Sequence, residues 1–276
     1  MKSKVFTLLI VLFAFTGLAQ QNRLNLAQPE VVYGNNPDAG HYVKTGDARL
    51  YYEVYGSGET IVLLHGGIMG SIEEMAGFIE KLKPDYQVIA LATRGHGKSE
   101  IGTATITYEL KANDVMAVVN AVTKSRVTIL GFSDGAYTGY KVASMYPDRV
   151  KKLVAIGAGE QIPGLRKVVF TGETFDPESE IWKQKKTLMP EPERLTEFWK
   201  SMENFYNSMV ASKELFMSIQ CPVLVMAGER DLNAPLSTVI NAYNMIPNSQ
   251  LSIIPNTGHV VLCKIFRQFG RVCIRF

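Results

Sequence analysis

The sequence predicts an α/β fold in which a mostly parallel central sheet is flanked by helices. Short continuous apolar runs, which are typical of strands buried on both faces, alternate along the chain with longer segments of helical periodicity. A hairpin pattern precedes this alternation, and one gap of about 60 residues, long enough to hold an inserted element, interrupts it. These observations favour one main sheet with an insertion.

The expected elements follow one another in the order that such a sheet requires. Residues 42–45 and 49–55, rich in β-branched and aromatic side chains, form the hairpin and are joined at Gly46-Asp47. The later strands are expected at 61–64, 87–91, 127–130, 153–156, 223–226 and 251–254. Helical patterns lie between strands at 72–83, 107–123, 135–146 and 236–245. This alternation predicts parallel strands with helices packed on the sheet.

The insertion follows the sixth expected strand. The sequence assigns residues 41–159 and 220–276 to the α/β core and residues 160–219 to a small helical cap. Apolar and aromatic side chains recur in the cap at helical spacing. They are Leu195, Phe198, Trp199, Met202, Phe205, Tyr206 and Met209. Residues 20–40 are polar and are interpreted as a lead-in to the core.

The first 19 residues have the pattern of a signal peptide. A basic start with Lys2 and Lys4 is followed by an apolar run from Val5 to Thr16 and by small residues that end at Ala19. The run is shorter than the ~20 residues needed to span a bilayer, so we expect cleavage, export and no stable membrane anchor afterwards. Without the two lysines the formal charge of +3 becomes nearly neutral, which argues against a nucleic-acid partner.

The strongest functional signal is Gly131-Phe132-Ser133-Asp134-Gly135, which directly follows an expected strand and precedes an expected helix. Glycines on both sides of the serine permit a tight strand-to-helix turn that raises the hydroxyl above the sheet. The N-terminus of the following helix stabilises negative charge that develops there. Ser133 is therefore the candidate nucleophile, and an ordinary structural turn is the alternative.

A serine hydroxyl needs a base and a group that orients the base. His259 directly follows the last expected strand, and the loops beyond the carboxyl ends of parallel strands share one face of the sheet with Ser133. Asp231 leaves the preceding strand on the same face and is the candidate acid, with Glu229 as its local competitor. Asp231 also suits the cap of a helix that begins near Pro235.

These residues belong to a set of motifs that resembles the α/β-hydrolase superfamily over about residues 41–262. The motifs are His65-Gly66-Gly67, Arg94-Gly95-His96-Gly97-Lys98-Ser99, Gly131 to Gly135, Gly228-x-x-Asp231-x-x-x-Pro235 and Gly258-His259. The chain order of serine, acid and histidine is also the order that this fold uses.

The resemblance implies further roles. The main-chain amides of Asp134 and of Gly67, or alternatively Ile68, would form an oxyanion hole. His65 and His96 would shape loops and would not act as acids or bases. We expect no cofactor and no metal site, because these histidines lack the ligand spacing of a zinc motif.

Two positions depart from the family pattern. The family usually carries an aspartate two residues before the arginine at position 94, where this chain has Ala92, so one loop-stabilising contact is expected to be missing. The family also has an acidic residue and a proline soon after the histidine, whereas residues 260–276 contain neither. These residues keep an apolar stripe. We interpret them as an unusual closing helix or as an altered chain end.

A serine nucleophile favours acyl transfer to water, and we expect a serine hydrolase that cleaves a carboxylic ester-type bond in a small molecule. A proline-iminopeptidase or carbon–carbon hydrolase activity is an alternative, as is a non-catalytic ligand-binding member of the fold. The cap residue Trp199 is a candidate for substrate binding, although its stripe also suits a helix core. The sequence leaves the oligomeric state open.

The elbow with Ser133-Asp134 is similar to that of the valacyclovir-hydrolase branch, which cleaves α-amino acid esters. This resemblance implies that the Asp134 carboxylate holds a substrate ammonium group. A solvated or helix N-terminal aspartate is the alternative.

The signal-peptide pattern predicts the first residue of the mature protein. N-terminal sequencing of protein recovered from the periplasm or the medium should find Gln20 or a near neighbour, because the small residues Gly17 and Ala19 suit signal peptidase. An intact Met1 on the recovered protein would contradict cleavage.

Overall fold

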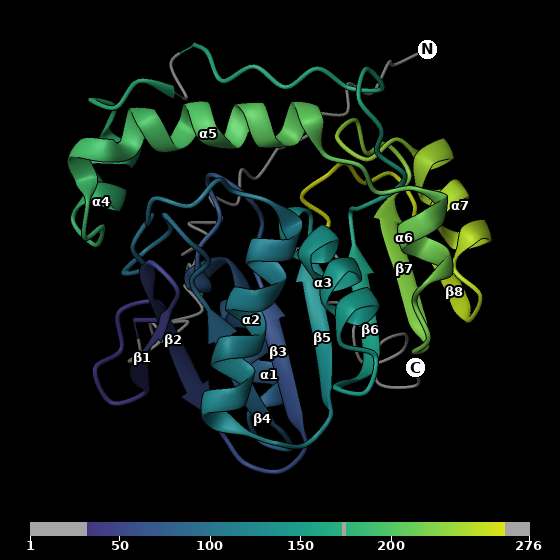
Figure 1. Cartoon of the computed structure of the whole chain (residues 1–276), viewed down its shortest axis with the longest axis horizontal. Coiled ribbons are helices and arrows are strands. Elements are labelled where there is room, and N and C mark those ends of the chain that lie inside the picture. Colours follow the sequence, from purple (N-terminus) through teal and green to yellow (C-terminus); the bar gives the residue numbers. More distant parts are fainter. Residues whose placement is uncertain (1–31, 173–174, 263–276) are drawn as a thin grey trace, which may run out of the picture. The chain divides into compact units, whose positions relative to one another are not determined.

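The computed structural model describes residues 32–172 and 175–262, so the expected signal segment and residues 263–276 of the expected closing helix lie outside it. Within the described residues, eight strands form one sheet in the order β1-β2-β4-β3-β5-β6-β7-β8 (Figure 1). The strands are β1 (Gly40–Thr45), β2 (Ala48–Tyr55), β3 (Thr60–Leu64), β4 (Gln87–Leu91), β5 (Val127–Phe132), β6 (Val150–Ile156), β7 (Val223–Gly228) and β8 (Ser249–Ile254).

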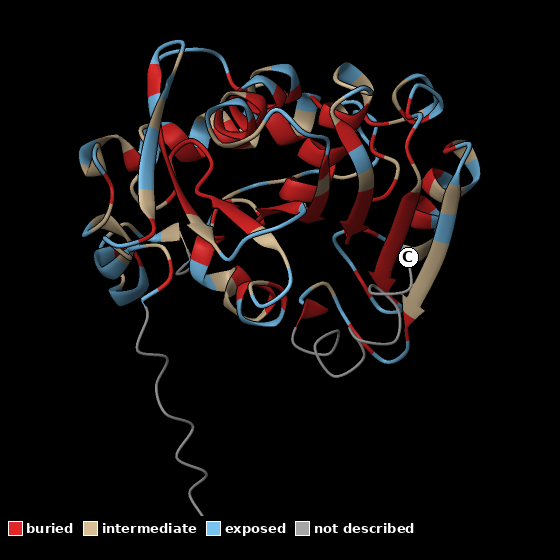
Figure 2. Ribbon diagram, turned by 90° about the horizontal axis from the view of Figure 1, so that it is seen from below, coloured by how far each residue is buried: buried red, intermediate tan, exposed pale blue. Residues whose placement is uncertain are grey.

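The pairing of these strands confirms the predicted fold class. β2 pairs antiparallel with β1 and β4, and every pair from β4 to β8 across the sheet is parallel. The residues of β3 and β7 are all buried, as expected for apolar runs covered on both faces. Figure 2 shows that β1 and β8, which form the two edges of the sheet, are only partly buried.

Helices lie against the sheet and beyond its edge. They are α1 (Ala76–Leu82), α2 (Tyr108–Val122), α3 (Asp134–Met145), α4 (Glu180–Lys186), α5 (Leu195–Ser208), α6 (Lys213–Met217) and α7 (Leu236–Met245), with 3-10 turns at η1 (Ile72–Met75) and η3 (Pro192–Arg194). The helix expected at 72–83 is thus a 3-10 turn followed by α1, and the α7 pattern matches the observed helix. No helix within the described ranges is long and apolar enough to cross a membrane.

The cap lies between β6 and β7, where the sequence predicts it, and consists of α4, η3, α5 and α6. Figure 1 shows α5 lying across the edge at which the parallel strands end. One face of α5 is apolar and buried, which holds the helix against the core. Its buried residues are Leu195, Phe198, Trp199, Met202, Phe205 and Tyr206.

The described part of the lead-in is bound to the sheet. Tyr33 is buried, and the main-chain amides of Gly34 and Asn36 each donate a hydrogen bond of 2.9 Å to the carboxylate of Glu53. Glu53 is itself fully buried in β2. The sequence predicts that the core begins at His41. The structure instead shows that the packed body begins upstream of this residue.

The loop with Arg94 is held although Ala92 replaces the expected aspartate. The guanidinium donates to Asp114 at 3.0 Å and to Asp47 at 2.8 Å. The hydroxyl of Ser99 donates to the carbonyl oxygen of Ala92 at 2.6 Å. Partners from β1–β2 and α2 thus stabilise this loop, and the loop in turn supports the site above it.

Candidate active site

Ser133 occupies the turn between β5 and α3 with φ of 51° and ψ of −115°. This conformation is rare for a residue other than glycine and is strained. A Cβ on Gly131 would lie 2.3 Å from the carbonyl oxygen of Gly135, and a Cβ on Gly135 would lie 2.3 Å from that of Leu64. Only glycine fits at both positions, which explains the spacing of the motif.

A chain of hydrogen bonds joins the three residues that the sequence selects. Ser133 Oγ lies 2.9 Å from His259 Nε2, and His259 Nδ1 lies 2.8 Å from Asp231 Oδ2. Because the Asp231 carboxylate accepts, Nδ1 carries the proton and donates, which leaves Nε2 to accept from the serine hydroxyl. A serine whose proton faces an oriented imidazole is the arrangement of an activated nucleophile.

Asp231 is fixed by more than the histidine. Its side chain is fully buried, and its Oδ1 atom accepts from the main-chain amides of Asn233 and Ala234, each at 2.8 Å. The carboxylate therefore organises the turn before α7 and orients His259 at the same time. Its competitor Glu229 is exposed and accepts from the main-chain amide of Asn256 at 2.8 Å.

The two expected oxyanion donors lie side by side. Asp134 is the first residue of α3, so its amide has no acceptor within the helix. A Cβ on Gly67 would lie 3.1 Å from Asp134 Cβ and only 1.9 Å from the Tyr206 hydroxyl oxygen. The alternative donor, Ile68, has φ of 55°, which is strained for a β-branched residue.

His65 and His96 hold the loops beneath the site. His65 Nδ1 lies 2.6 Å from the carbonyl oxygen of Gly66, and its Nε2 accepts from the amide of Thr93 at 3.1 Å. Burial lowers the pKa of His65 to about 4 and lowers the pKa of His96 well below its ordinary value. Both rings are therefore neutral near pH 7.

Comparisons with known proteins agree with this architecture. A family model described as alpha/beta hydrolase fold matches residues 59–182. The crystal structure of a serine hydrolase involved in carbazole degradation superposes with a TM-score of 0.71 at 22% identity, covering 86% of this chain and 97% of the other. The chain therefore has the α/β-hydrolase fold.

Two relatives extend the comparison along most of the chain. A 2-hydroxy-6-oxononadienedioate/2-hydroxy-6-oxononatrienedioate hydrolase of Pseudomonas putida is 27% identical to this protein, over 83% of this chain and 92% of the relative. Serine hydrolase BPHL of Homo sapiens is 23% identical, over 91% of this chain and 90% of the relative.

The Asp134 side chain already has a cationic partner. Its Oδ2 atom forms an ion pair with Lys111 of α2, and both side chains are at most 5% exposed. Its Oδ1 atom is buried with no hydrogen-bond partner among the described residues. This differs from the expectation that the carboxylate faces a substrate ammonium group, because Lys111 occupies the place of that cation.

A cavity of about 600 Å³ lies in front of Ser133 and His259. Aromatic and charged side chains line it between the core and the cap, among them Glu74, Tyr137, Arg166, Phe170, Phe175 and Tyr206. Trp199 is not among the lining residues. Instead it is buried, with ring centroids 5.4 Å from Phe175 and 4.7 Å from Trp182. The structure thus places Trp199 behind the cavity wall, contrary to the expected contact with substrate.

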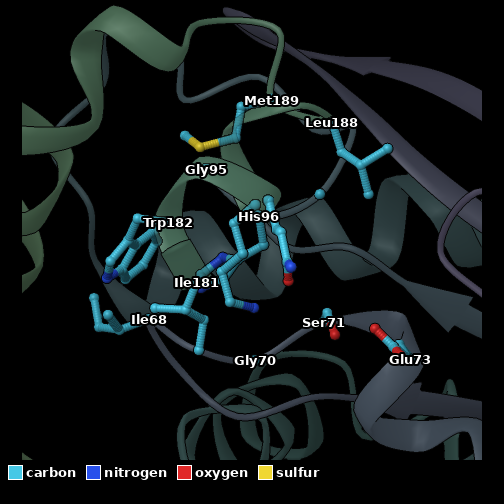
Figure 3. A pocket seen from close by; sticks show the side chains of 13 residues that line it. Ile68, Gly70, Ser71, Glu73, Gly95, His96, Ile181, Trp182, Leu188 and Met189 are labelled. Carbon is cyan, nitrogen blue, oxygen red and sulfur yellow. The ribbon is translucent and has the colours of Figure 1, made fainter. Parts of the chain in front are cut away.

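A second cavity of about 320 Å³ adjoins the first. Ile68 and Gly70 line both, so this short segment separates them. Figure 3 shows Ile68, Ile181 and Trp182 on one side of the second cavity, and Ser71 and Glu73 on the other. One wall is therefore apolar and the opposite wall polar.

Two charged residues of the site were not selected from the sequence: Lys111 and Arg166. Lys111 lies on the buried face of α2 with Tyr108, Ala112 and Val115, so a lysine among apolar helical positions was an available signal. The cap gave no comparable signal for Arg166, whereas Tyr206 belongs to the aromatic stripe expected there and does line the cavity. Among the described residues, no group of three His, Cys, Asp or Glu side chains is arranged to hold a metal ion.

The contacts of the two acidic residues predict different effects of their substitution. Asp231→Asn should lower kcat for an ester by roughly a hundredfold or more, since the histidine loses the acceptor that fixes its tautomer. Glu229→Gln is the matched control and should stay within about threefold of the parent, because an amide oxygen still accepts from Asn256. A larger loss for Glu229→Gln would reverse the assignment of the acid.

Proposed function

We propose that this protein, which has the α/β-hydrolase fold, cleaves carboxylic ester-type bonds through an acyl-enzyme, with Ser133 as nucleophile, His259 as base and Asp231 as the orienting acid. The observation that carries the proposal is the hydrogen-bonded series Ser133–His259–Asp231, with distances of 2.9 and 2.8 Å, in which Ser133 and His259 line a cavity. Both the geometry and the tautomer that it imposes on His259 fit nucleophilic catalysis.

The geometry supports a two-step reaction. Ser133 Oγ attacks the ester carbonyl carbon while its proton passes to His259 Nε2, and the carbonyl oxygen becomes an oxyanion between the amides of Gly67 and Asp134. His259 then gives the proton to the departing alcohol, which leaves an acyl group on Ser133. Water, deprotonated by the same nitrogen, attacks the acyl group and releases the acid and the free serine.

The cavity suits a small-molecule substrate. Its volume of about 600 Å³ lies within the usual range for such sites. Phe170, Phe175 and Tyr206 contribute apolar surface for the acyl or alcohol part. Burial raises the pKa of the Tyr206 hydroxyl well above its ordinary value, so this group is neutral near pH 7.

A second candidate function is carbon–carbon bond hydrolysis with the same residues, and Arg166 favours it. Arg166 lines the cavity, donates to the carbonyl oxygen of Asn233 at 2.6 Å, and has no acidic partner among the described residues. A guanidinium without a carboxylate is suited to an anionic group of a substrate. The Pseudomonas putida relative is named for a dioate substrate, which would carry such groups.

We also propose that the protein is exported after removal of residues 1–19. The support is the basic and apolar pattern of those residues in the sequence.

Turnover of a chromogenic short-chain ester such as p-nitrophenyl acetate tests the proposed function. The parent should release p-nitrophenol and react with a fluorophosphonate probe, and Ser133→Ala should lose roughly a thousandfold or more in kcat because the nucleophile is gone. Ser144→Ala, on the same helix α3, is the matched control and should keep parental activity. If Ser133→Ala retains more than a tenth of the parental rate, Ser133 is not the nucleophile. A parent inert toward both ester and probe indicates a binding protein.

The unpaired charge of Arg166 predicts a preference for anionic substrates. The ratio of kcat/KM for p-nitrophenyl hemisuccinate to that for neutral p-nitrophenyl butyrate should fall about tenfold in Arg166→Met, since about 1.4 kcal/mol of attraction is lost. Lys200→Met, which removes an exposed cation of the same cap away from the cavity lining, should keep the parental ratio. An unchanged ratio in Arg166→Met would remove the argument for an anionic substrate.

A further inference from the structure

The buried ion pair between Lys111 and Asp134 lies directly beside the nucleophile. Lys111 reaches it from α2 and Asp134 from the first turn of α3, and their side chains are 5% and 2% exposed. Taking two charges out of water is costly, and a hydrophobic pair often replaces a buried ion pair without loss of stability. Stability alone therefore gives no strong reason for this pair.

The position of Asp134 suggests a role for the ion pair in catalysis. Only a few covalent bonds separate its carboxylate from its own main-chain nitrogen, which is one of the two donors proposed for the oxyanion. In a buried site, where charges interact strongly, an uncompensated carboxylate there would repel the negative charge that forms on the substrate oxygen. The amide and the carboxylate of the same residue would then act in opposite directions.

We propose that Lys111 is a positioning residue that neutralises Asp134, so that the Asp134 amide can stabilise the oxyanion. This inference rests on the proposed hydrolase function. The Lys111 ammonium binds Oδ2, and Oδ1 is buried without a partner among the described residues. The carboxylate is held beside Gly67, where a Cβ would lie 3.1 Å from Asp134 Cβ and 1.9 Å from the Tyr206 hydroxyl oxygen.

The same pair sets the response of the site to substrate charge. A substrate ammonium group would have to displace Lys111 in order to reach the carboxylate, so the parent should not favour cationic esters. Removal of the lysine alone would expose Asp134 to such a group. Lys111 is thus a determinant of specificity as well as of rate.

A helix-stabilising role is the competing explanation, since a carboxylate in the first turn of α3 interacts favourably with the helix dipole. That role predicts changes in thermal stability without a selective change in kcat. The two explanations therefore separate in kinetic measurements on folded variants.

The test compares Lys111→Met with the double variant Lys111→Met/Asp134→Asn. For p-nitrophenyl acetate, Lys111→Met should lower kcat at least tenfold with KM within twofold, and the rate of fluorophosphonate reaction should fall in parallel. The double variant should recover most of this loss, because it keeps the main-chain amide and removes the uncompensated charge. The control is Lys141→Met. It breaks a more exposed ion pair between the same two helices, formed by Lys141 of α3 and Glu109 of α2, and should keep parental kinetics.

Three results would overturn the proposal. One is a folded Lys111→Met with kcat within twofold of the parent, and another is a double variant as slow as Lys111→Met. The third needs only the parent and Asp134→Asn, and so decides the matter if Lys111→Met does not fold. In this result, kcat/KM of the parent is tenfold higher for a glycine p-nitrophenyl ester than for its N-acetyl counterpart, and Asp134→Asn abolishes the difference. Failure of the parent to react with any ester or fluorophosphonate would instead refute the proposed hydrolase function.

Discussion

The site depends on the close approach of the turn at Ser133 to the neighbouring strand β3. The Cβ atoms that Gly131 and Gly135 lack would fall 2.3 Å from carbonyl oxygens of Gly135 and Leu64, respectively. This packing holds Ser133 at a positive φ of 51°, and the surrounding sheet compensates the strain. As a consequence, the hydroxyl leaves the sheet at the N-terminus of α3, where a helix dipole stabilises negative charge.

The parallel sheet then brings the remaining groups to that hydroxyl. Asp231 and His259 follow β7 and β8, and Ser133 follows β5, so all three leave the same edge of the sheet. Asp231 adds a local constraint, because one carboxylate oxygen is bound by the turn before α7 and the other by the histidine. The buried acid cannot rotate away without breaking both sets of bonds, which keeps the imidazole in one orientation.

The sequence was sufficient for the features that depend on local pattern and on topology. The strands and α7 were predicted because apolar runs and helical periodicity are local properties. The grouping of Ser133, Asp231 and His259 was predicted because the ends of parallel strands share an edge. Side-chain partners were not predictable in this way. Trp199 has the same helical spacing whether it faces a ligand or the core, and its contacts with Phe175 and Trp182 exist only in the folded cap.

Asp134 shows that the net charge beside the nucleophile cannot be inferred from the residues of the sequence motif alone. The motif contains one carboxylate beside the serine, which suggests attraction for cations, but Lys111, 23 residues away in the chain, cancels it. Asp231 is likewise bonded to His259, whereas Arg166 has no acidic partner among the described residues. Of these three groups, Arg166 is therefore the most available to a substrate. In the proposed reaction, neutralising the Asp134 carboxylate removes a repulsion that the two proposed amide donors would otherwise have to overcome.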